Sequence, residues 1–593
     1  MKSLIELLEI EVKKAFVAAG YDEKYGMVTY SNRADLSEFQ CNGALAGAKI
    51  YHKSPLIIAK EVCEILQRCP YFEEVNAFAP GFINMNVSPA YAAEYLNEMS
   101  NDSRLGCEKN SNSRKVILDF GGPNVAKPLH VGHLRSAIIG ESLKRILKFM
   151  GDNVLGDIHM GDWGLQIGLI ITELKHREPQ SVYFDSDFNG EYPNKAPFTI
   201  SDLEEIYPTA SALSKENEEY RNEALYATKE LQNGRRGYIA LWKQIMAASV
   251  ADLKKNYEKL NVTFDLWKGE ADADPYIAPM IEKMKADNVA HIDDGALIID
   301  VSEPEDTKEV PPCMILKSDG ASLYTTTDLA TLQERMEDYA PDLVLYVVDK
   351  RQDLHFLQVF RASRKARIVP EKTELTFLGF GTMNGKDAKP FKTREGGTMR
   401  LQDLLTDVRI KMEEKIAENA TITGDEARNV AAKVALSAIK YGDLSNQAAK
   451  DYIFDVDRFT SFEGNTGPYI LYTIVRINSI LNKYKENCAQ QSSDIIGTYK
   501  ILPAGTQGEK ALMLEASKFS ETINFAYEEL APHKICAYIF NLANLANRFY
   551  HDTKILTESD SEKQKSYIAL LSLIVRVLEQ CIDLLGFEAP ERM

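Results

Sequence analysis

Two histidines and a lysine lie close together in the segment PNVAKPLHVGH, which covers residues 123–133. Lys127 brings a compact positive charge, and the imidazoles of His130 and His133 can bond to phosphate oxygens. Gly132, between the histidines, would let a nucleotide approach the backbone closely. These residue types favour a phosphate-binding site, although HxGH alone also fits two capping or packing histidines at the start of a helix.

The sequence around this segment predicts the elements that would position it. The apolar run at 116–118 is typical of a buried parallel strand, and a helix is expected from about Leu129 to Met150. A second strand, DLVLYVVD at 342–349, precedes a helix from about Leu354. This alternation predicts a Rossmann-like, doubly wound parallel α/β domain. Ligands of such sheets bind beyond the strand ends, where helix N-termini offer unpaired N–H groups.

Composition narrows the class of protein. With 593 residues the chain is too long for one core, and no run of about 18 apolar residues predicts a membrane span. A net charge of -18 argues against indiscriminate binding to DNA or RNA, but leaves room for one specific RNA. Eight cysteines without a CxxC pair predict no structural zinc and fit a reducing cytoplasm. Glu6, Glu9 and Glu11 speak against a secretory signal.

Changes of pattern along the chain predict several domains. Two short strands around the Pro80-Gly81 turn indicate an α+β unit at the N-terminus, and the last third of the chain reads as almost entirely helical. The expected regions are an N-terminal α+β domain at 1–108, an α/β domain at 113–405 with a charged helical insertion at about 175–290, a helical connector at 406–454, and an all-α helical bundle at 455–593.

The longer segment PNxAKPxHxGHLRS resembles the first signature of class I aminoacyl-tRNA synthetases, in the version of the arginyl family. The resemblance implies that ATP, with Mg²⁺, is a substrate. Attack at its α-phosphate depends mainly on positioning and charge stabilisation. Lys127, His130 and His133 are the expected catalytic residues. The expected ATP-binding residues of this segment are Pro123, Asn124, Lys127, His130, Gly132 and His133.

Residues 381–401, GTMNGKDAKPFKTREGGTMRL, resemble the second phosphate loop of the same family. The form FKTR ends in Arg394, where the usual signature has a lysine. We expect Lys389 to supply the mobile cation and Arg394 to assist it, because an ammonium can follow departing pyrophosphate. Lys386 and Lys392 are expected to bind ATP. A mobile, lysine-rich surface loop remains the alternative.

Selecting arginine requires carboxylates, because its guanidinium is planar, permanently charged and carries five N–H donors. The resemblance indicates Asp119, at the end of the first strand, and Asp328, in YTTTD, which is similar to a YxTRD motif although Thr327 replaces its arginine. A capping or solvated role is the alternative for either carboxylate. The other expected contacts are Asn124, Tyr324 and Gln352 for arginine and His355 for adenosine. HMGDWGLQ at 159–166 matches a further motif and is expected to be scaffold.

The two ends of the chain resemble the RNA-binding domains of the arginyl family. Residues expected to frame an anticodon loop are Tyr469, Tyr472, Tyr550 and Met593, because aromatic faces stack on unpaired bases. Phe39, Gln40 and Asn42 are candidates for contact with the corner of the tRNA. Tyrosines at helical spacing can equally belong to a helix core.

The resemblance runs from about residue 20 to residue 593. It implies an arginine–tRNA ligase that activates L-arginine with ATP, transfers it to the 3′ end of tRNA(Arg), and releases AMP and pyrophosphate. Activation is expected to need bound tRNA, and the chain is expected to be a monomer without a DNA or membrane partner. A class I synthetase for another amino acid, a small-molecule nucleotidylyltransferase and a non-catalytic tRNA-binding relative are the alternatives.

Overall fold

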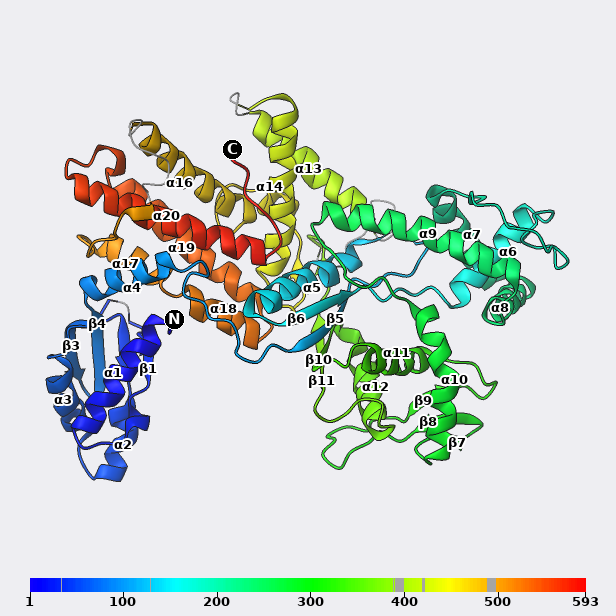
Figure 1. Cartoon of the computed structure of the whole chain (residues 1–593), viewed down its shortest axis with the longest axis horizontal. Helices are drawn as coiled ribbons and strands as arrows, with labels where there is room; N and C mark the ends of the chain where they lie inside the picture. The colour runs from blue at the N-terminus through cyan, green and yellow to red at the C-terminus, as the bar shows by residue number, and fades with distance from the viewer. Residues whose placement is uncertain (34, 128, 388, 390–398, 419–421, 488–496) are drawn as a thin grey trace.

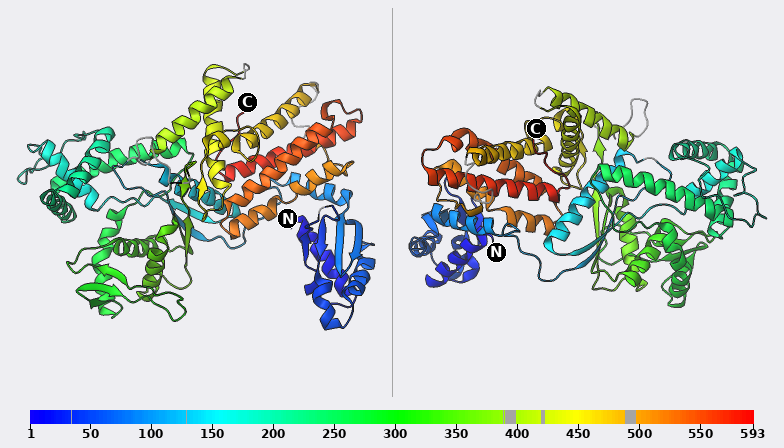
Figure 2. Two further views of the ribbon diagram at one scale, coloured as in Figure 1. Left: turned by 180° about the vertical axis from the view of Figure 1, so that it is seen from behind. Right: turned by 45° about the horizontal axis from the view of Figure 1, so that its top comes forward.

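The computed structural model describes residues 1–33, 35–127, 129–387, 389, 399–418, 422–487 and 497–593. Three lobes can be followed in Figure 1, where the N-terminal domain hangs below the lobe of long helices and the α/β domain lies to the right of that lobe. The N-terminal domain lies beside a lobe of long helices, the α/β domain follows, and further helices project from its far side, an arrangement also seen in Figure 2. No helix within the described ranges is long and apolar enough to cross a membrane.

The N-terminal domain is an antiparallel sheet covered by helices. Its first helix, α1 (Leu4–Ala18), begins at a Ser3–Glu6 capping box and buries the apolar face that the sequence predicts. The sheet has the order β1-β2-β4-β3, and β3 and β4 confirm the strand pair predicted around Pro80. Its elements are η1 (Glu23–Tyr25), β1 (Val28–Tyr30), β2 (Phe39–Cys41), α2 (Gly43–Tyr51), α3 (Pro55–Leu66), β3 (Phe72–Phe78), β4 (Phe82–Val87) and α4 (Pro89–Asn101).

The central domain is built on a parallel sheet in the order β11-β10-β5-β6. The chain leaves β5 toward β6 on one side, while β10 joins β5 on the other, so a crevice opens where β5 and β10 end. The strands are β5 (Lys115–Phe120), β6 (Asn153–Asp157), β10 (Leu343–Asp349) and β11 (Glu374–Phe380). The helices beside them are α5 (Val131–Met150), α11 (Tyr324–Asp338) and α12 (Asp353–Lys365), with the short turn η2 (Lys350–Gln352). The predicted α/β fold is confirmed.

The region between β6 and α11 forms the projecting part of this domain. Its helices are α6 (Leu165–Arg177), α7 (Ile200–Glu216), α8 (Glu218–Gln232), α9 (Arg236–Lys259) and α10 (Glu270–Ala286). They confirm the helical character predicted for 175–290. A small antiparallel sheet was not predicted; its strands are β7 (His291–Asp293), β8 (Ala296–Ile299) and β9 (Cys313–Leu316). Such short strands carry little alternation, and β7 is exposed at every position.

The last part of the chain is predominantly helical, as predicted. Its helices are α13 (Leu401–Ala417), α14 (Gly424–Leu444), α15 (Val456–Phe459), α16 (Gly467–Asn487), α17 (Gln507–Ala516), α18 (Phe519–Glu528), α19 (Pro532–Asp552), η4 (Ile555–Thr557) and α20 (Ser561–Leu584). A two-residue pairing of β12 (Met383–Asn384) with β13 (Tyr452–Ile453) joins this region to the α/β domain.

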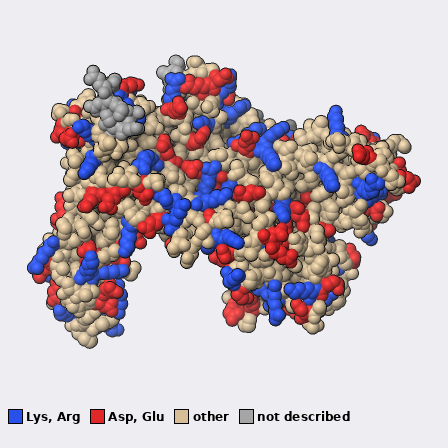
Figure 3. Space-filling model, viewed as in Figure 1, with Lys and Arg blue, Asp and Glu red and all other residues tan. Residues whose placement is uncertain are grey.

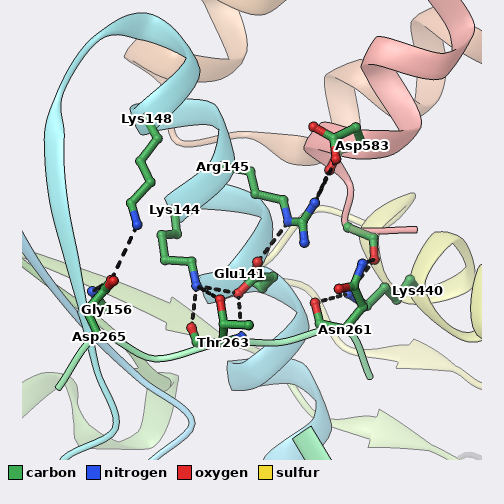
Figure 4. A network of polar contacts seen from close by, with 11 residues as sticks. Glu141, Lys144, Arg145, Lys148, Gly156, Asn261, Thr263, Asp265, Lys440 and Asp583 are labelled. Carbon is green, nitrogen blue, oxygen red and sulfur yellow. Dashed lines mark hydrogen bonds and ion pairs between the residues drawn. The ribbon is translucent and has the colours of Figure 1, made fainter. Parts of the chain in front are cut away.

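A polar junction ties α5 to the C-terminal helices (Figure 4). Glu141 accepts a hydrogen bond from Arg145 at 2.8 Å, and Arg145 also reaches the Asp583 carboxylate at 2.8 Å. Lys440 of α14 is fully buried and donates to the carbonyl oxygen of Gly586 at 2.8 Å. Because α5 begins at the HVGH turn, these contacts hold that turn in a defined position relative to the helical lobe.

Candidate active site

The HVGH turn forms the N-terminus of α5. His130 is the N-cap residue, and its Nδ1 accepts a hydrogen bond from the Gly132 N–H at 3.0 Å. The His130 N–H in turn donates to Nδ1 of His133 at 3.2 Å, and the two ring centroids lie 3.9 Å apart. A Cβ on Gly132 would come within 2.7 Å of the His130 ring, so glycine permits this fold of the ring over the backbone.

The two imidazoles are neutral near pH 7. Burial lowers the pKa of His133 to about 3, and burial followed by the charge of Lys127 lowers the pKa of His130. The ammonium of Lys127 lies 4.4 Å from the ring centroid of Tyr207, on α7. The positive charge of this turn therefore comes from Lys127, while the histidines act as neutral hydrogen-bonding groups.

The end of the second loop pairs with the first signature. The Val131 N–H donates to the Met399 carbonyl at 3.1 Å, and the Leu401 N–H donates to the Leu129 carbonyl at 2.8 Å. Segments some 270 residues apart thus meet at the start of α5.

The cations predicted in the second loop have different surroundings. Lys386 forms ion pairs with Asp455 at 3.1 Å and Asp457 at 2.8 Å, so its charge is shared with the start of α15. Lys389 is exposed. Lys392 and Arg394 lie outside the described residues.

Asp119 has an internal partner. Nη2 of Arg335 lies 2.6 Å from Oδ2 of Asp119 and 2.7 Å from Oδ2 of Asp157, the residue opposite Asp119 in the neighbouring strand. The guanidinium is 2% exposed and the Asp119 side chain 12% exposed. Arg335 therefore already offsets the charge of Asp119, and the predicted contact of Asp119 with arginine stays a prediction. The strand pairing that aligns Asp119 with Asp157 creates this guanidinium site.

Asp328, in contrast, faces a second acidic residue. Its Oδ2 lies 2.5 Å from Nε2 of His355, and its side chain is 21% exposed. Burial raises the pKa of Glu270, the first residue of α10, and the negative charge of Asp328 raises it further. Burial and the charge of Glu270 likewise raise the pKa of Tyr324. Glu270, Asp328 and Tyr324 therefore lie near one another, and we call this neighbourhood the acidic space.

Asp119 and Asp328 belong to one neighbourhood. Both carboxylates raise the pKa of Tyr346 through their charge, after the larger effect of its burial. Tyr346 lies opposite Asp119 in the sheet register. Both carboxylates predicted from the sequence thus act on one buried tyrosine, Asp119 while paired with Arg335 and Asp328 while bonded to His355.

The segment HMGDWGLQ lies between the first signature and Glu270. The Gly161 N–H donates to the Pro123 carbonyl at 3.2 Å, and a Cβ at Gly161 would lie 2.3 Å from Oδ1 of Asn124. The Glu270 N–H donates to the Met160 carbonyl at 3.0 Å. The segment therefore has the scaffold role that we expected. Sequence reasoning missed Glu270, because locally it is one acid among many in a charged helical stretch.

Two further predicted residues lie on the rim of the crevice. Gln352 is exposed in the short turn before α12, and Asn124 is exposed at the first signature. Tyr324 begins α11 and is 75% exposed, so its ring is accessible from solvent. All three side chains are placed so that a small ligand could reach them.

A cavity of about 550 Å³ lies between α13, α16 and the C-terminus. It brings together Tyr469, Tyr472 and Met593, as predicted. The guanidinium of Arg476 lies 4.6 Å from the centroid of the Tyr472 ring and 5.4 Å from that of the Tyr550 ring. Tyr550, the fourth residue predicted for this region, thus lies next to the cavity. Tyr472 and Tyr550 are 39% and 41% exposed, which leaves aromatic surface open to a partner.

The N-terminal candidates divide into core and surface. Phe39 is 2% exposed and packs against Tyr30 with ring centroids 5.2 Å apart. Its predicted role as an RNA contact is wrong for this conformation, because every second side chain of a strand faces the core. Gln40, on the other face, is half-buried and donates to Asn84 at 2.9 Å. Asn42 is exposed and makes no side-chain capping bond at the start of α2.

Three family models match consecutive parts of the chain. The model described as "tRNA synthetases class I (R), catalytic domain" matches residues 96–456, the "Arginyl tRNA synthetase N terminal domain" matches 2–87, and the "DALR anticodon binding domain" matches 470–593. The chain belongs to the arginyl-tRNA synthetase family. The resemblance drawn from its signatures is confirmed.

Individual relatives of this family agree over the full length. The arginine–tRNA ligase of Agathobacter rectalis is 61% identical and that of Alkaliphilus oremlandii 54% identical, each covering 100% of both chains. The crystal structure of the arginyl-tRNA synthetase from Plasmodium falciparum superposes with a TM-score of 0.80 at 25% identity, covering 100% of both chains. The Thermus thermophilus enzyme, at 22% identity and a TM-score of 0.78, shares the fold.

In this synthetase fold the described residues include no group of three or more His, Cys, Asp or Glu side chains arranged to hold a metal ion. Carboxylates near the crevice are instead committed to Arg335, to His355 or to the acidic space beside Tyr324.

Proposed function

We infer that the chain activates L-arginine with ATP, as the magnesium complex, and transfers it to the 3′ end of tRNA(Arg), releasing AMP and pyrophosphate. One arrangement carries this inference. The segment HMGDWGLQ bonds to Pro123 of the first signature on one side and to Glu270 on the other, so the proposed phosphate-binding turn and the acidic space of Glu270 and Asp328 both adjoin it. ATP and an organic cation could therefore be bound side by side.

The nucleotide would lie between the two paired loops. The N-terminus of α5 offers backbone N–H groups and partial positive charge to phosphate oxygens. Lys127 adds a full charge, and neutral His130 and His133 can donate hydrogen bonds without adding further charge. Charge would build up on pyrophosphate as it leaves, and preorganised donors of this kind stabilise such a transition state. Lys389 is proposed to follow the leaving group.

The arginine side chain would enter the acidic space. We propose that its guanidinium faces Asp328 and Glu270, with the Tyr324 ring beside it, and that Asn124 and Gln352 hold the α-amino and carboxylate groups. Glu270 is the addition that the structure suggests. Asp119 would act through Arg335 by keeping this wall of the pocket in place, and His355 would orient Asp328 through their hydrogen bond.

The tRNA would contact both ends of the molecule. The anticodon loop is proposed to meet the cavity with Tyr469, Tyr472, Tyr550 and Met593, in the domain from 455 to 593. Gln40 and Asn42, in the domain from 1 to 108, are proposed to approach the tRNA corner. Acidic and basic side chains are interspersed on the face in Figure 3, so recognition would depend on such local groups rather than on overall attraction.

The decisive experiment is aminoacylation of tRNA(Arg) with each of the twenty amino acids, followed by ATP–pyrophosphate exchange with and without tRNA. Charging with arginine alone is expected. A neutral amino acid in a pocket built for a guanidinium would leave the buried carboxylates unpaired, and such a pocket can discriminate against it by about 10⁴–10⁵. Efficient charging with another amino acid would overturn the proposal. Nucleotidyl transfer to a small molecule without tRNA would favour the nucleotidylyltransferase alternative.

A further inference from the structure

One face of helix α7 contacts both phosphate loops. The Tyr207 ring lies under the Lys127 ammonium of the first signature, with 4.4 Å between Nζ and the ring centroid. Glu204 forms an ion pair with Arg400, near the end of the second loop, at 3.1 Å. Residues three apart on a helix share a face, so a single surface of the insertion meets a cation from each loop.

We propose that Tyr207 is a positioning residue for adenylate formation: its ring holds the Lys127 ammonium where the triphosphate of ATP will lie. This inference rests on the ATP-binding role of Lys127 proposed above. It assigns to the helical insertion a part in the first chemical step.

The chemistry of an aromatic partner explains why a tyrosine suits this position. A carboxylate would neutralise the ammonium and compete with the phosphates for it. The face of an aromatic ring attracts the cation through its quadrupole but has no net charge, so Lys127 stays fully available to ATP. Among the interactions of the described residues, no ion pair involves Lys127, whereas the neighbouring Glu204 is paired with Arg400.

The position of Lys127 matters because the turn has no other full charge. His130 and His133 are kept neutral by burial and by the charge of Lys127 itself. A flexible lysine side chain would otherwise sample many rotamers, and ordering it on binding would cost conformational entropy. A ring that restrains the ammonium before ATP arrives reduces this cost.

The test compares ring-retaining with ring-removing variants in ATP–pyrophosphate exchange, with tRNA(Arg) present. Tyr207→Phe keeps the aromatic face, and Tyr207→Leu removes it at similar size. We expect the KM for ATP to rise about tenfold in Tyr207→Leu and less than about twofold in Tyr207→Phe, with KM for arginine changed less than about twofold. Tyr226→Leu, at a 60% exposed position on neighbouring α8, is the matched control and should behave as the parent enzyme.

A double-mutant cycle decides whether the effect passes through Lys127. ATP binding is measured by calorimetry for Lys127→Ala with and without Tyr207→Leu, and the second change should add nothing. Equal losses in both backgrounds, or equal behaviour of the Phe and Leu variants, would overturn the inference. Unchanged ATP affinity of Lys127→Ala alone would instead overturn the proposed role of Lys127. Should Tyr207→Leu fold poorly, Tyr207→Met offers a second non-aromatic variant with an adaptable side chain.

Discussion

The two carboxylates predicted to select arginine should respond differently to removal of their charge. Asp119 shares the buried guanidinium of Arg335 with Asp157, at 2.6 and 2.7 Å, whereas Asp328 faces the acidic space with Glu270. Asp119→Asn should therefore impair mainly the stability of the α/β domain, and Asp328→Asn mainly the binding of arginine. Each change preserves the shape of the side chain, so charge is the variable.

The size of each effect follows from burial. Removing one partner of a buried ion pair costs about 3–5 kcal/mol, and the lower end, about 3 kcal/mol, applies to Asp119→Asn because Asp157 still neutralises Arg335. That loss corresponds to a fall in unfolding temperature on the order of 5–10 °C. A similar loss in the complex with arginine would raise its KM about a hundredfold in Asp328→Asn.

Thermal unfolding and ATP–pyrophosphate exchange with varied arginine measure the two effects in the same preparations. Asp342→Asn is a suitable control, because Asp342 is exposed and lies at the opposite, amino-terminal end of the sheet. A hundredfold increase in the arginine KM of Asp119→Asn at unchanged stability would refute the reasoning, since Asp119 would then contact the substrate itself. An unchanged arginine KM in Asp328→Asn would remove Asp328 from the pocket.

Four further outcomes are expected. The pKa of His133 in the folded protein, about 3, lies below its ordinary value of 6.5, so the unfolded chain takes up a proton first and stability should fall as pH drops from about 6.5 toward 3. In urea unfolding, the stability of His133→Asn should depend less on pH between these values. Burial lowers the pKa of Lys440 from 10.5 to about 7, so the unfolded chain binds more protons than the folded one between these values and the parent loses stability as pH falls from 10.5 to 7. Lys440→Met lacks this titration, so in urea unfolding its free energy of unfolding should rise relative to that of the parent by about 1.4 kcal/mol for each pH unit of this fall. Gly161→Ala places a Cβ 2.3 Å from Oδ1 of Asn124 and should raise the KM for arginine about tenfold or more, measured by exchange kinetics. Tyr472→Ala should raise the KM for tRNA about tenfold and leave the KM for ATP unchanged in aminoacylation assays.

These expectations show which site features were readable from the sequence. The proposed phosphate-binding turn was readable, because it is built from contiguous residues: a strand, a loop and a helix N-terminus that follow one another. The anticodon-side aromatic residues were also readable in part, since the motif that carries Tyr469 and Tyr472 lies on one helix. Local periodicity likewise predicted β3, β4, β5 and β10 and the long helices, because each of these elements buries one face or is buried throughout.

Contacts between distant segments were not readable. Arg335 meets Asp119 across 216 residues of chain, and Glu270 and Tyr207 come from an insertion whose local pattern is only that of a charged helix. Phe39 lies in a motif that was expected to contact RNA, but it points to the inner face of its strand and is buried in the core.

The sequence by itself thus determined the family, the α/β fold and the HVGH turn at the start of α5, because these depend on neighbouring residues and their spacing. Tertiary structure alone decided the partner of each carboxylate: the guanidinium of Arg335 for Asp119 and the imidazole of His355 for Asp328. That choice depends on the burial and packing of side chains from separate elements, and the strength of a charge interaction changes with both.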